Sequence, residues 1–366
     1  MVVFVLQGNA IALDHILSRS MEIKTNSCPM LICVFLFFCC VALVGCDQGS
    51  TAENERYQRY RNLVVNTKEK VHAFNPEEVI ASNLGRIRVL GPYVILSDYL
   101  AADYLINVFN KNSLRFLGKF GDVGQGPGEI SNLGGIAYDE QRGLLYVTDH
   151  GGNRIFSYNV DSALLVGGYR PWVKQKTSEH IMPTEFTFVN DTVSYGVIAK
   201  YTAPNTALRI TGKWNMEKGT VQIHEHVYPN IPIKAQRVSF AYSKEHNVLV
   251  EASRHYDMIN ILDGELNLIS RVLGPQWNKR GDNKKHFTDV VIYKKWIIAA
   301  YEGSNYDPYL YPHICHVFSL DGEYIKSIDI GYPMTYISCD EDNGRLFFSS
   351  NDEPQFGYLD LKGILD

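Results

Sequence analysis

The chain has 366 residues, of which 45% are apolar and 20% charged, and its formal net charge is −5. This is the composition of an ordinary globular protein, and it excludes a disordered chain, a collagen and a multi-span membrane protein. The mild negative charge provides no basic stripe, so we expect no nucleic-acid partner.

The first 45 residues have the pattern of an export signal. Residues 30–45 form an apolar run without a charge, and Lys24 precedes it. The run is shorter than the roughly 20 residues that cross a bilayer, which favours a secretory signal peptide over residues 1–45. A single transmembrane helix or a signal peptide without lipid is the alternative. We expect Met21 to be the true start, because residues 1–20 take no part in the pattern.

The apolar run ends in Leu43-Val-Gly-Cys46, which resembles a bacterial lipobox. The resemblance implies that Cys46 carries the lipid and becomes the first residue after cleavage. Acyl chains would then attach the protein to a membrane. We expect residues 46–60 to form a polar, lipidated tether and residues 61–366 to form the folded domain.

A repeated unit fills the rest of the chain, and its clearest copy covers residues 133–168. Short runs rich in β-branched and aromatic residues alternate with turn residues, which predicts a four-stranded antiparallel meander. In this copy the runs are Gly135–Asp139, Leu144–Asp149, Arg154–Asn159 and Ala163–Val166. Six copies follow one another between residues 86 and 361 at a spacing of roughly 40–50 residues, which is typical of propeller blades. The sequence therefore predicts an all-β, six-bladed β-propeller.

The two ends of the repeat region predict how the ring closes. The sixth copy has only three strands, and an unpaired edge would invite aggregation. Leu63–Phe74 lies before the first copy and has no partner of its own. We expect this segment to supply the outer strand of the last blade, the alternative being a linker.

Two motifs carry a resemblance to known families. Residues 146–158, YVTDHGGNRIFSY, resemble the core of an NHL-type propeller repeat, and residues 118–129 resemble the glycine-rich loop of TolB-like propeller lipoproteins of Bacteroidetes. The resemblance implies a fold and a location rather than a reaction. The location is the bacterial cell envelope, with the protein lipid-anchored at the outer membrane rather than the inner one and facing the periplasm or the cell surface.

The glycine-rich loop allows two interpretations. A dinucleotide site is excluded, because Pro127 interrupts the glycines and a strand follows instead of a helix. We expect a structural loop between blades, in which the glycines take backbone angles closed to other residues and Glu129 accepts backbone hydrogen bonds. The alternative is that Gln125 and Glu129 contact a ligand. The loop residues are Gly124, Gln125, Gly126, Pro127, Gly128 and Glu129.

One face of the propeller collects the unusual residues. In a four-stranded antiparallel blade the hairpin between the second and third strands opens on the same face as the connection to the next blade. Aromatic, basic and amide side chains there suit a polar ligand, although a solvated loop face is the alternative. The candidate ligand-binding residues are His150, Asn153, Arg154, Trp172, Arg254, His255, Tyr256, Trp277 and Tyr306.

No catalytic motif is present, and the histidine pairs at 224/226 and 313/316 supply too few ligands for a metal site. We therefore expect no cofactor and a non-catalytic binding or scaffold lipoprotein whose partner is a polysaccharide, a peptide or a protein. The alternative is a metal-dependent lactonase, lyase or hydrolase with a divalent ion at the mouth of the central channel. Three or four ligands from different blades would have to converge there.

Overall fold

The computed structural model describes residues 54–178, 180–203, 206–224, 237–277, 284–305 and 310–365. The expected signal peptide, Cys46 and Tyr306 lie outside these residues. The part of the chain from Asn54 onward forms one compact unit. Within the described residues, no helix is both long enough and apolar enough to cross a bilayer.

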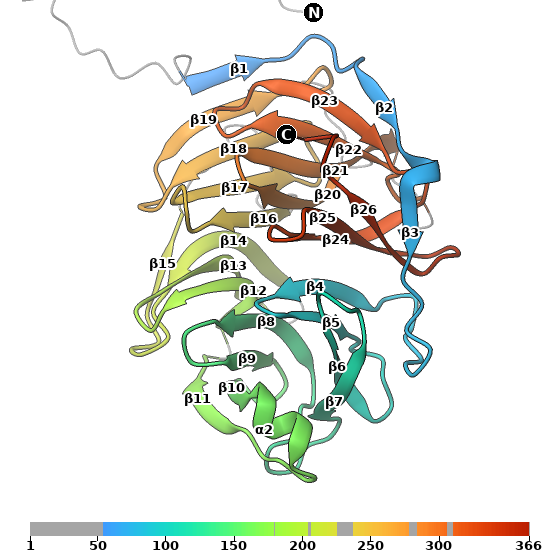
Figure 1. The fold of residues 1–366 in the computed structure, drawn as a ribbon. Helices are drawn as coiled ribbons and strands as arrows, with labels where there is room; N and C mark the ends of the chain where they lie inside the picture. The colour runs from blue at the N-terminus through green and yellow to red at the C-terminus, as the bar shows by residue number, and fades with distance from the viewer. Residues whose placement is uncertain are drawn as a thin grey trace, which may run out of the picture. The chain divides into compact units, whose positions relative to one another are not determined.

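Six sheets build the unit, and each contains four antiparallel strands, as predicted (Figure 1). Two of the sheets carry a fifth, parallel strand from the N-terminal segment. Blade 1 consists of β4 (Arg86–Leu90), β5 (Tyr93–Ser97), β6 (Tyr104–Asn110) and β7 (Phe116–Asp122). Blade 2 consists of β8 (Leu133–Asp139), β9 (Leu144–Asp149), β10 (Arg154–Asn159) and β11 (Trp172–Lys176). Blade 3 consists of β12 (Ile181–Asn190), β13 (Val193–Ala203), β14 (Thr206–Trp214) and β15 (Val221–Ile223).

The second half of the ring repeats this order. Blade 4 consists of β16 (Val238–Ser243), β17 (Val248–Ser253), β18 (Met258–Asp263) and β19 (Leu268–Leu273). Blade 5 consists of β20 (Lys284–Tyr293), β21 (Trp296–Asn305), β22 (Ile314–Ser319) and β23 (Tyr324–Asp329). Blade 6 consists of β24 (Met334–Asp340), β25 (Arg345–Ser350), β26 (Phe356–Asp360) and the N-terminal β3 (Val71–Ala73).

The apolar core is divided among the junctions between blades. Every residue of β9 is buried, as are the five central residues of β6, because both faces of these strands pack against a neighbouring sheet. Separate apolar clusters lie between successive blades, including one between blades 6 and 1 that contains Phe74, Phe109 and Phe347. This last cluster joins the end of the ring to its beginning.

The N-terminal belt, residues 54–74, runs along the outer edges of three blades. β1 (Glu55–Tyr57) adds to blade 4 beside β19, and β2 (Val64–Asn66) adds to blade 5 beside β23, both in parallel. β3 then completes blade 6 by pairing antiparallel with β26. The predicted closure by the N-terminal segment is confirmed, and the contact of β1 begins inside the expected tether 46–60.

A buried ion pair fixes the belt between β1 and β2. Arg61 Nη1 lies 2.6 Å from Asp257 Oδ1, and the two side chains are 5% and 0% exposed. The guanidinium also lies over three aromatic rings of blade 5, those of Phe287, Tyr301 and Phe318. Arg61 therefore links the belt to the junction of blades 4 and 5.

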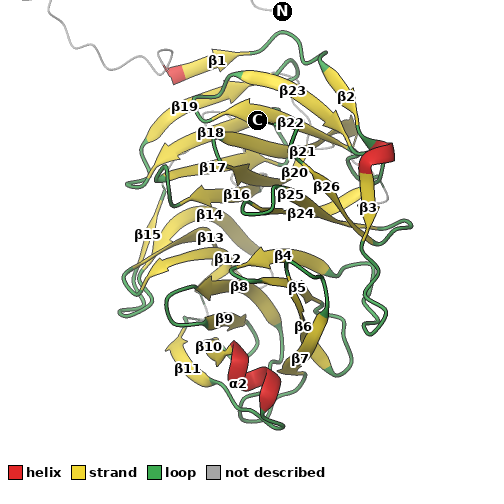
Figure 2. Cartoon of the chain, in the orientation of Figure 1, coloured by secondary structure: helices red, strands yellow, loops and turns green. Residues whose placement is uncertain are grey.

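The fourth strand of blade 2 differs from the prediction. Val160–Leu165 forms a short helix, α2, in place of the expected strand Ala163–Val166 (Figure 2). Asn159 caps the helix, since its side chain accepts a hydrogen bond from Ser162 N. The outer strand comes later, as β11. The blade remains four-stranded, with a helical insertion before its last strand.

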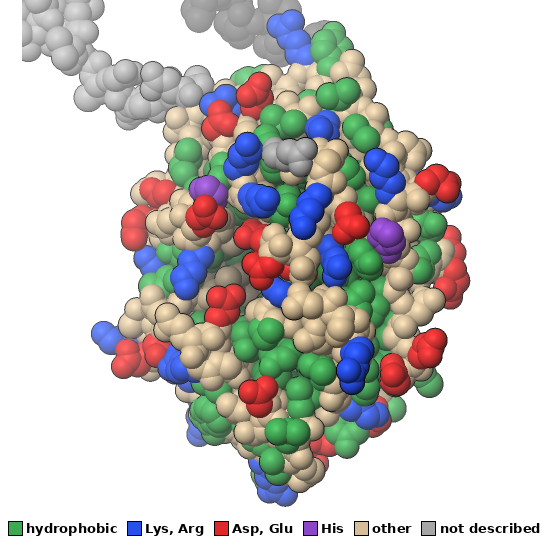
Figure 3. Space-filling view, in the orientation of Figure 1, with side chains coloured by type: hydrophobic (Ala, Val, Ile, Leu, Met, Phe, Trp, Pro, Cys, Tyr) green, Lys and Arg blue, Asp and Glu red, His purple; other side chains and the backbone are tan. Residues whose placement is uncertain are grey.

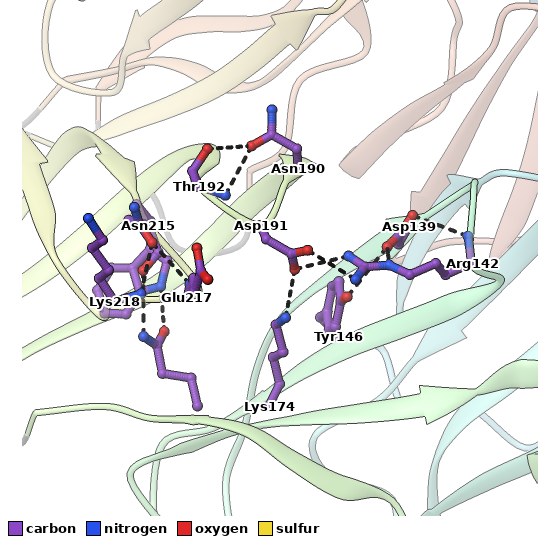
Figure 4. A network of polar contacts seen from close by, with 12 residues as sticks. Asp139, Arg142, Tyr146, Lys174, Asn190, Asp191, Thr192, Asn215, Glu217 and Lys218 are labelled. Atoms are coloured by element: carbon purple, nitrogen blue, oxygen red, sulfur yellow. Dashed lines mark hydrogen bonds and ion pairs between the residues drawn. The ribbon is translucent and has the colours of Figure 1, made fainter.

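Ion pairs connect blades 2 and 3 at the turns between first and second strands (Figure 4). The Asp191 carboxylate lies 3.0 Å from Arg142 Nη2 and 2.6 Å from Lys174 Nζ. These two cations hold the pKa of Asp191 at about 2. Arg142 also pairs with Asp139 of its own blade, so the network joins two neighbouring turns.

Candidate functional site

A cavity of about 360 Å³ lies at the axis, on the face where the hairpins between second and third strands open. All six blades contribute to its wall, and we call it the mouth cavity. The residues used below are Arg86, Tyr99, His150, Arg209, Arg237, Arg254 and Tyr336. A concave site with a few convergent polar groups is the usual form of a ligand pocket.

Local chain geometry explains how four arginines reach this cavity. Arg86 is the first residue of an innermost strand, and Arg237 directly precedes another. Arg254 directly follows β17, and its backbone N donates to Arg237 O at 2.8 Å. Arg209 lies on a third strand, and it lines the cavity because the hairpin of β13 and β14 is longer than those of blades 1 and 2.

Within the described residues, the arginines of the mouth cavity make no ion pair, although the Asp289 carboxylate lies close enough to act on Arg86. Among the described residues, no hydrogen bond or ion pair engages the side chain of Arg86, Arg209, Arg237 or Arg254. The pKa of Arg209 is lowered mainly because the surrounding protein removes part of its solvation, and secondly because the other three arginines are charged. The side chain is still exposed. The wall therefore carries four arginines against the two carboxylates of Glu185 and Asp289, and basic side chains predominate.

An aromatic ring orients one of these side chains. The Arg86 guanidinium lies 4.6 Å from the centre of the Tyr336 ring, a cation–π geometry. Its Nε atom is buried and has no hydrogen-bond partner in the described structure. A buried donor without an acceptor is costly, so packing and the Tyr336 ring, rather than a hydrogen bond at Nε, hold the Arg86 side chain in place.

Three further charged residues interact at the axis, and two of them, Glu185 and Asp289, line the mouth cavity. Arg88 of blade 1 pairs with Glu185 of blade 3, and Asp289 of blade 5 lies close enough to influence both Arg88 and Arg86. Asp289 also accepts hydrogen bonds from the backbone N of Val290 and of Ile337. Burial raises the pKa of Asp289 and lowers that of Arg88. Both carboxylates therefore already have partners within the protein.

A second cavity of about 370 Å³ opens on the opposite face. Its wall combines aromatic residues such as Tyr138 and Phe188 with acidic residues such as Glu140 and Glu341. Burial raises the pKa of Glu341. The two cavities therefore differ in their balance of charge: basic side chains predominate at the mouth, and acidic ones predominate in the second cavity, which also contains Arg88, Lys111 and Lys244.

Two of the predicted ligand-binding residues line the mouth cavity, His150 and Arg254. The His150 ring is half-buried, and its Nε2 lies 3.2 Å from Pro183 O. Burial lowers the pKa of His150, and the nearby Arg209 and Arg86 lower it further. His150 is therefore a neutral side chain at neutral pH, suited to hydrogen bonding rather than to charge pairing.

Arg154 and Asn153 have structural roles in the hairpin of blade 2. Arg154 Nε donates to Asp149 Oδ2 at 3.0 Å, and its Nη2 donates to Glu129 O at 3.0 Å. Asn153 has a φ of 48°, which an asparagine tolerates in a tight turn. Neither residue lines the mouth cavity. Arg154 holds the hairpin of blade 2 against the connection that enters this blade, whereas Asn153 O accepts a hydrogen bond from Thr177 N at 2.8 Å.

Asp149 explains the motif that resembles NHL repeats. Its carboxylate accepts hydrogen bonds from Ser131 N and Oγ, at the entry to blade 2. In blade 1, Asp98 accepts from Ser82 N and Oγ in the same way. An aspartate at the end of the second strand thus fastens the incoming chain to its blade.

The remaining predicted residues lie away from the cavity or outside the described residues. Trp172 begins the outer strand β11 and is 48% exposed, and Trp277 packs edge-to-face against Tyr57 of the belt. Tyr256 packs against Met258 and Leu273, while His255, which has a partner of its own, does not line the cavity. Tyr306 is not described. Trp172 was predicted as a ligand-binding residue on the assumption that blade 2 ends before it; it lies instead in the outer strand of blade 2, because α2 displaces that strand.

The glycine-rich loop contains a hydrogen bond to the side chain of its own glutamate, Glu129. Glu129 Oε2 accepts a hydrogen bond from Gly126 N at 2.7 Å. A Cβ on Gly124 or Gly126 would collide with the Glu129 carboxylate, and Gly128 has a φ of +86°. Only the last of these glycines is required for its backbone angle. Neither Gln125 nor Glu129 lines the mouth cavity.

Sequence reasoning missed Arg86, Arg209, Arg237 and the tyrosines Tyr99 and Tyr336. A charged residue at the very start of the first strand of a blade was an available signal for Arg86 and Arg237, because such positions face the axis. Arg209 gave no such signal. Its place depends on the length and direction of one hairpin.

The cavity offers a metal ion few ligands. In the described part of the chain, no group of three or more His, Cys, Asp or Glu side chains could hold one. His313 instead contacts Asp329, and the buried His316 contacts Ser327 Oγ. The metal-dependent alternative therefore has no ligand set among these residues.

The comparisons with known proteins agree with this architecture. Residues 75–173 match DUF5128, a family described as a 6-bladed beta-propeller. The search of curated proteins found no significant match. This family match covers the entry to blade 1, all of blade 1 and most of blade 2.

Solved structures of low identity show the same fold. A DUF4221 family member from Bacteroides vulgatus is 13% identical, with a TM-score of 0.51, over 79% of this chain and 94% of that one. Regucalcin, a calcium-binding protein from Agrobacterium tumefaciens, is 11% identical, with a TM-score of 0.52, over 81% and 95%. The protein U3-55K is 9% identical, with a TM-score of 0.52, over 80% and 99%. At such identities the likeness concerns the fold alone.

Proposed function

We propose that this protein is a lipid-anchored lipoprotein of the bacterial cell envelope whose propeller binds a polysaccharide, a peptide or a protein partner without catalysing a reaction. The mouth cavity carries the proposal. Six blades converge on one concave, polar site with tyrosines at its wall, and the described residues around it form no metal centre. Such a site suits recognition of a polar ligand.

The sequence supports the anchor. An apolar run ends in Leu43-Val-Gly-Cys46, and a polar segment follows it. Two or more acyl chains on Cys46 would hold a folded domain on a membrane, since each buried CH₂ contributes about 0.8 kcal/mol. The outer membrane is the proposed location, in line with the resemblance to propeller lipoproteins of Bacteroidetes.

Thermal-shift screening of polysaccharide fragments and peptides tests the binding function. A ligand at about 100 times its Kd stabilises the protein by about 2.7 kcal/mol, which is a measurable shift of Tm. Tyr99→Ala changes the wall of the mouth cavity, and Trp277→Ala changes an aromatic residue outside it. We expect the first substitution to abolish the ligand-induced shift and the second to retain it.

Two outcomes would contradict the proposal. A shift lost in Trp277→Ala and retained in Tyr99→Ala would move the ligand to the rim near the belt. Conversion of a bound ligand into a product, detected by mass spectrometry, would make the protein an enzyme.

A further inference from the structure

The charge of the mouth cavity says more about the ligand than its shape does. Four arginine side chains line the cavity, and none of them forms an ion pair or hydrogen bond with a described residue. The two carboxylates of the wall already have partners: Glu185 pairs with Arg88, and Asp289 accepts two backbone hydrogen bonds. A folded protein rarely assembles like charges without a counter-charge, because they repel one another.

The guanidinium groups can also donate hydrogen bonds to a ligand. Arg86 is oriented by the Tyr336 ring, and its buried Nε has no acceptor in the described structure. The pKa of Arg209 is lowered by loss of solvation and then by the charges of Arg237, Arg86 and Arg254, which lie near it. Guanidinium groups bind carboxylates and phosphates through paired hydrogen bonds, which are the strong ones.

The size of the site limits the ligand. A cavity of about 360 Å³ admits a compact molecule, such as a short oligosaccharide. Outside the cavity the charges are mixed, as Figure 3 shows for the face in view, and the whole chain carries a net charge of −5. Long nucleic acids need an extended basic surface, so this pattern disfavours them.

We infer that the mouth cavity binds a compact ligand with at least two oxyanion groups, an inference that rests on the proposed binding function. Carboxylate, phosphate and sulfate share the required chemistry. Arg209 and Arg237 bind the anion from opposite sides of the junction between blades 3 and 4. Arg86 presents a third guanidinium to the anion from blade 1.

Calorimetry on the full chain in detergent tests the inference with three probes. Trigalacturonate supplies carboxylates, inorganic pyrophosphate supplies phosphates, and maltotriose is a neutral molecule of similar size to the first. We expect at least one anionic probe to bind and to weaken as salt is added. Arg209→Gln or Arg237→Gln should lower its affinity by about tenfold or more, because a charge-assisted hydrogen bond is lost.

Arg115→Gln is the matched control, since Arg115 is an exposed residue in the turn between β6 and β7. It should leave the affinity unchanged. Without ligand, the two cavity variants should keep or raise Tm at low ionic strength, because repulsion is relieved, so loss of binding cannot be ascribed to unfolding. Carboxylate and phosphate sources are separated by which anionic probe binds.

Equal binding of maltotriose and trigalacturonate, unaffected by the cavity variants, would overturn the oxyanion inference and leave the binding function intact. Failure of all three probes would also overturn the inference. The proposed function would fall with it only if the wider ligand screen found nothing as well.

Discussion

At the scale of single residues, two arginines in equivalent hairpins have different roles because their surroundings differ. Arg154 is tied to Asp149 and to Glu129 O, so it holds a hairpin against the connection between blades. Arg254 has no such partner among the described residues and lines the mouth cavity. Sequence reasoning treated both as ligand candidates. Residue type alone could not separate them, because the partner lies on another segment.

Glu129 offers a direct test of the loop that joins blades 1 and 2. Its carboxylate is half-buried and accepts a hydrogen bond from Gly126 N. We expect Glu129→Ala to lower the free energy of unfolding by about 1–3 kcal/mol, the cost of leaving such a donor without its acceptor. Urea denaturation measures the change. Arg254→Ala is the control and should be neutral or slightly stabilising, because it removes one of several like charges.

If Glu129→Ala unfolds like the wild type and loses a bound ligand, the loop is a binding element. The interpretation of the glycines as partners of the carboxylate would then be wrong.

His316 predicts how stability depends on pH. Burial, and secondarily the charge of Arg61, lower its pKa from 6.5 to about 2. The unfolded chain therefore binds a proton below about pH 6.5 that the native state does not bind. The stability that this residue provides is complete above that pH and falls by up to about 1.4 kcal/mol per pH unit below it.

His316→Asn keeps a hydrogen-bonding group near Ser327 and removes the titration. Urea denaturation at several pH values should show a shallower loss of stability in the variant between about pH 6 and pH 4. If the free energy of unfolding falls equally with pH in the two proteins, the titration of His316 is not the cause.

At the scale of elements, the N-terminal belt is the part of the fold that local patterns predicted least completely. The outer strand β3 was predicted from an unpaired edge, whereas β1 and β2 were not. Each has three residues and pairs in parallel with a distant strand, so no alternation or turn signal marks it. The helix α2 was missed for a different reason. Its apolar residues also suit a strand, and only the cap Asn159 and Asp161 in the first turn indicate a helix.

Arg61 should be the main attachment of the belt. Arg61→Met keeps most of the side-chain volume but leaves the buried Asp257 without its cation. Breaking a buried ion pair in this way costs about 3–5 kcal/mol. Arg56→Ala is the control within the same belt, since its pair with Asp321 is 50% and 62% exposed and should contribute about 0–1 kcal/mol. Comparable destabilisation by the two substitutions would mean that Arg61 does not fix the belt.

At the scale of the whole molecule, the period of the repeat predicted the number of blades, and the missing strand predicted the closure. Both follow from counting short strands, which the turn residues separate clearly. The mouth cavity could not be predicted in this way. Its wall combines single residues from all six blades, and only the folded ring brings Arg86, Arg209 and Arg237 together.

The proposed anchor concerns the whole chain, and its prediction concerns Cys46. Cys46→Ser removes the thiol at the end of the apolar run, so we expect it to abolish incorporation of radioactive fatty acid and to leave a soluble or an uncleaved protein. Cys40→Ser is the matched control inside the expected leader and should label normally. The ring that begins at Asn54 contains all its closing contacts, so Tm of the released protein should match that of the anchored one. A Cys46→Ser protein that still labels and sediments with membranes would refute the lipobox, and the resemblance to propeller lipoproteins would then support only the fold.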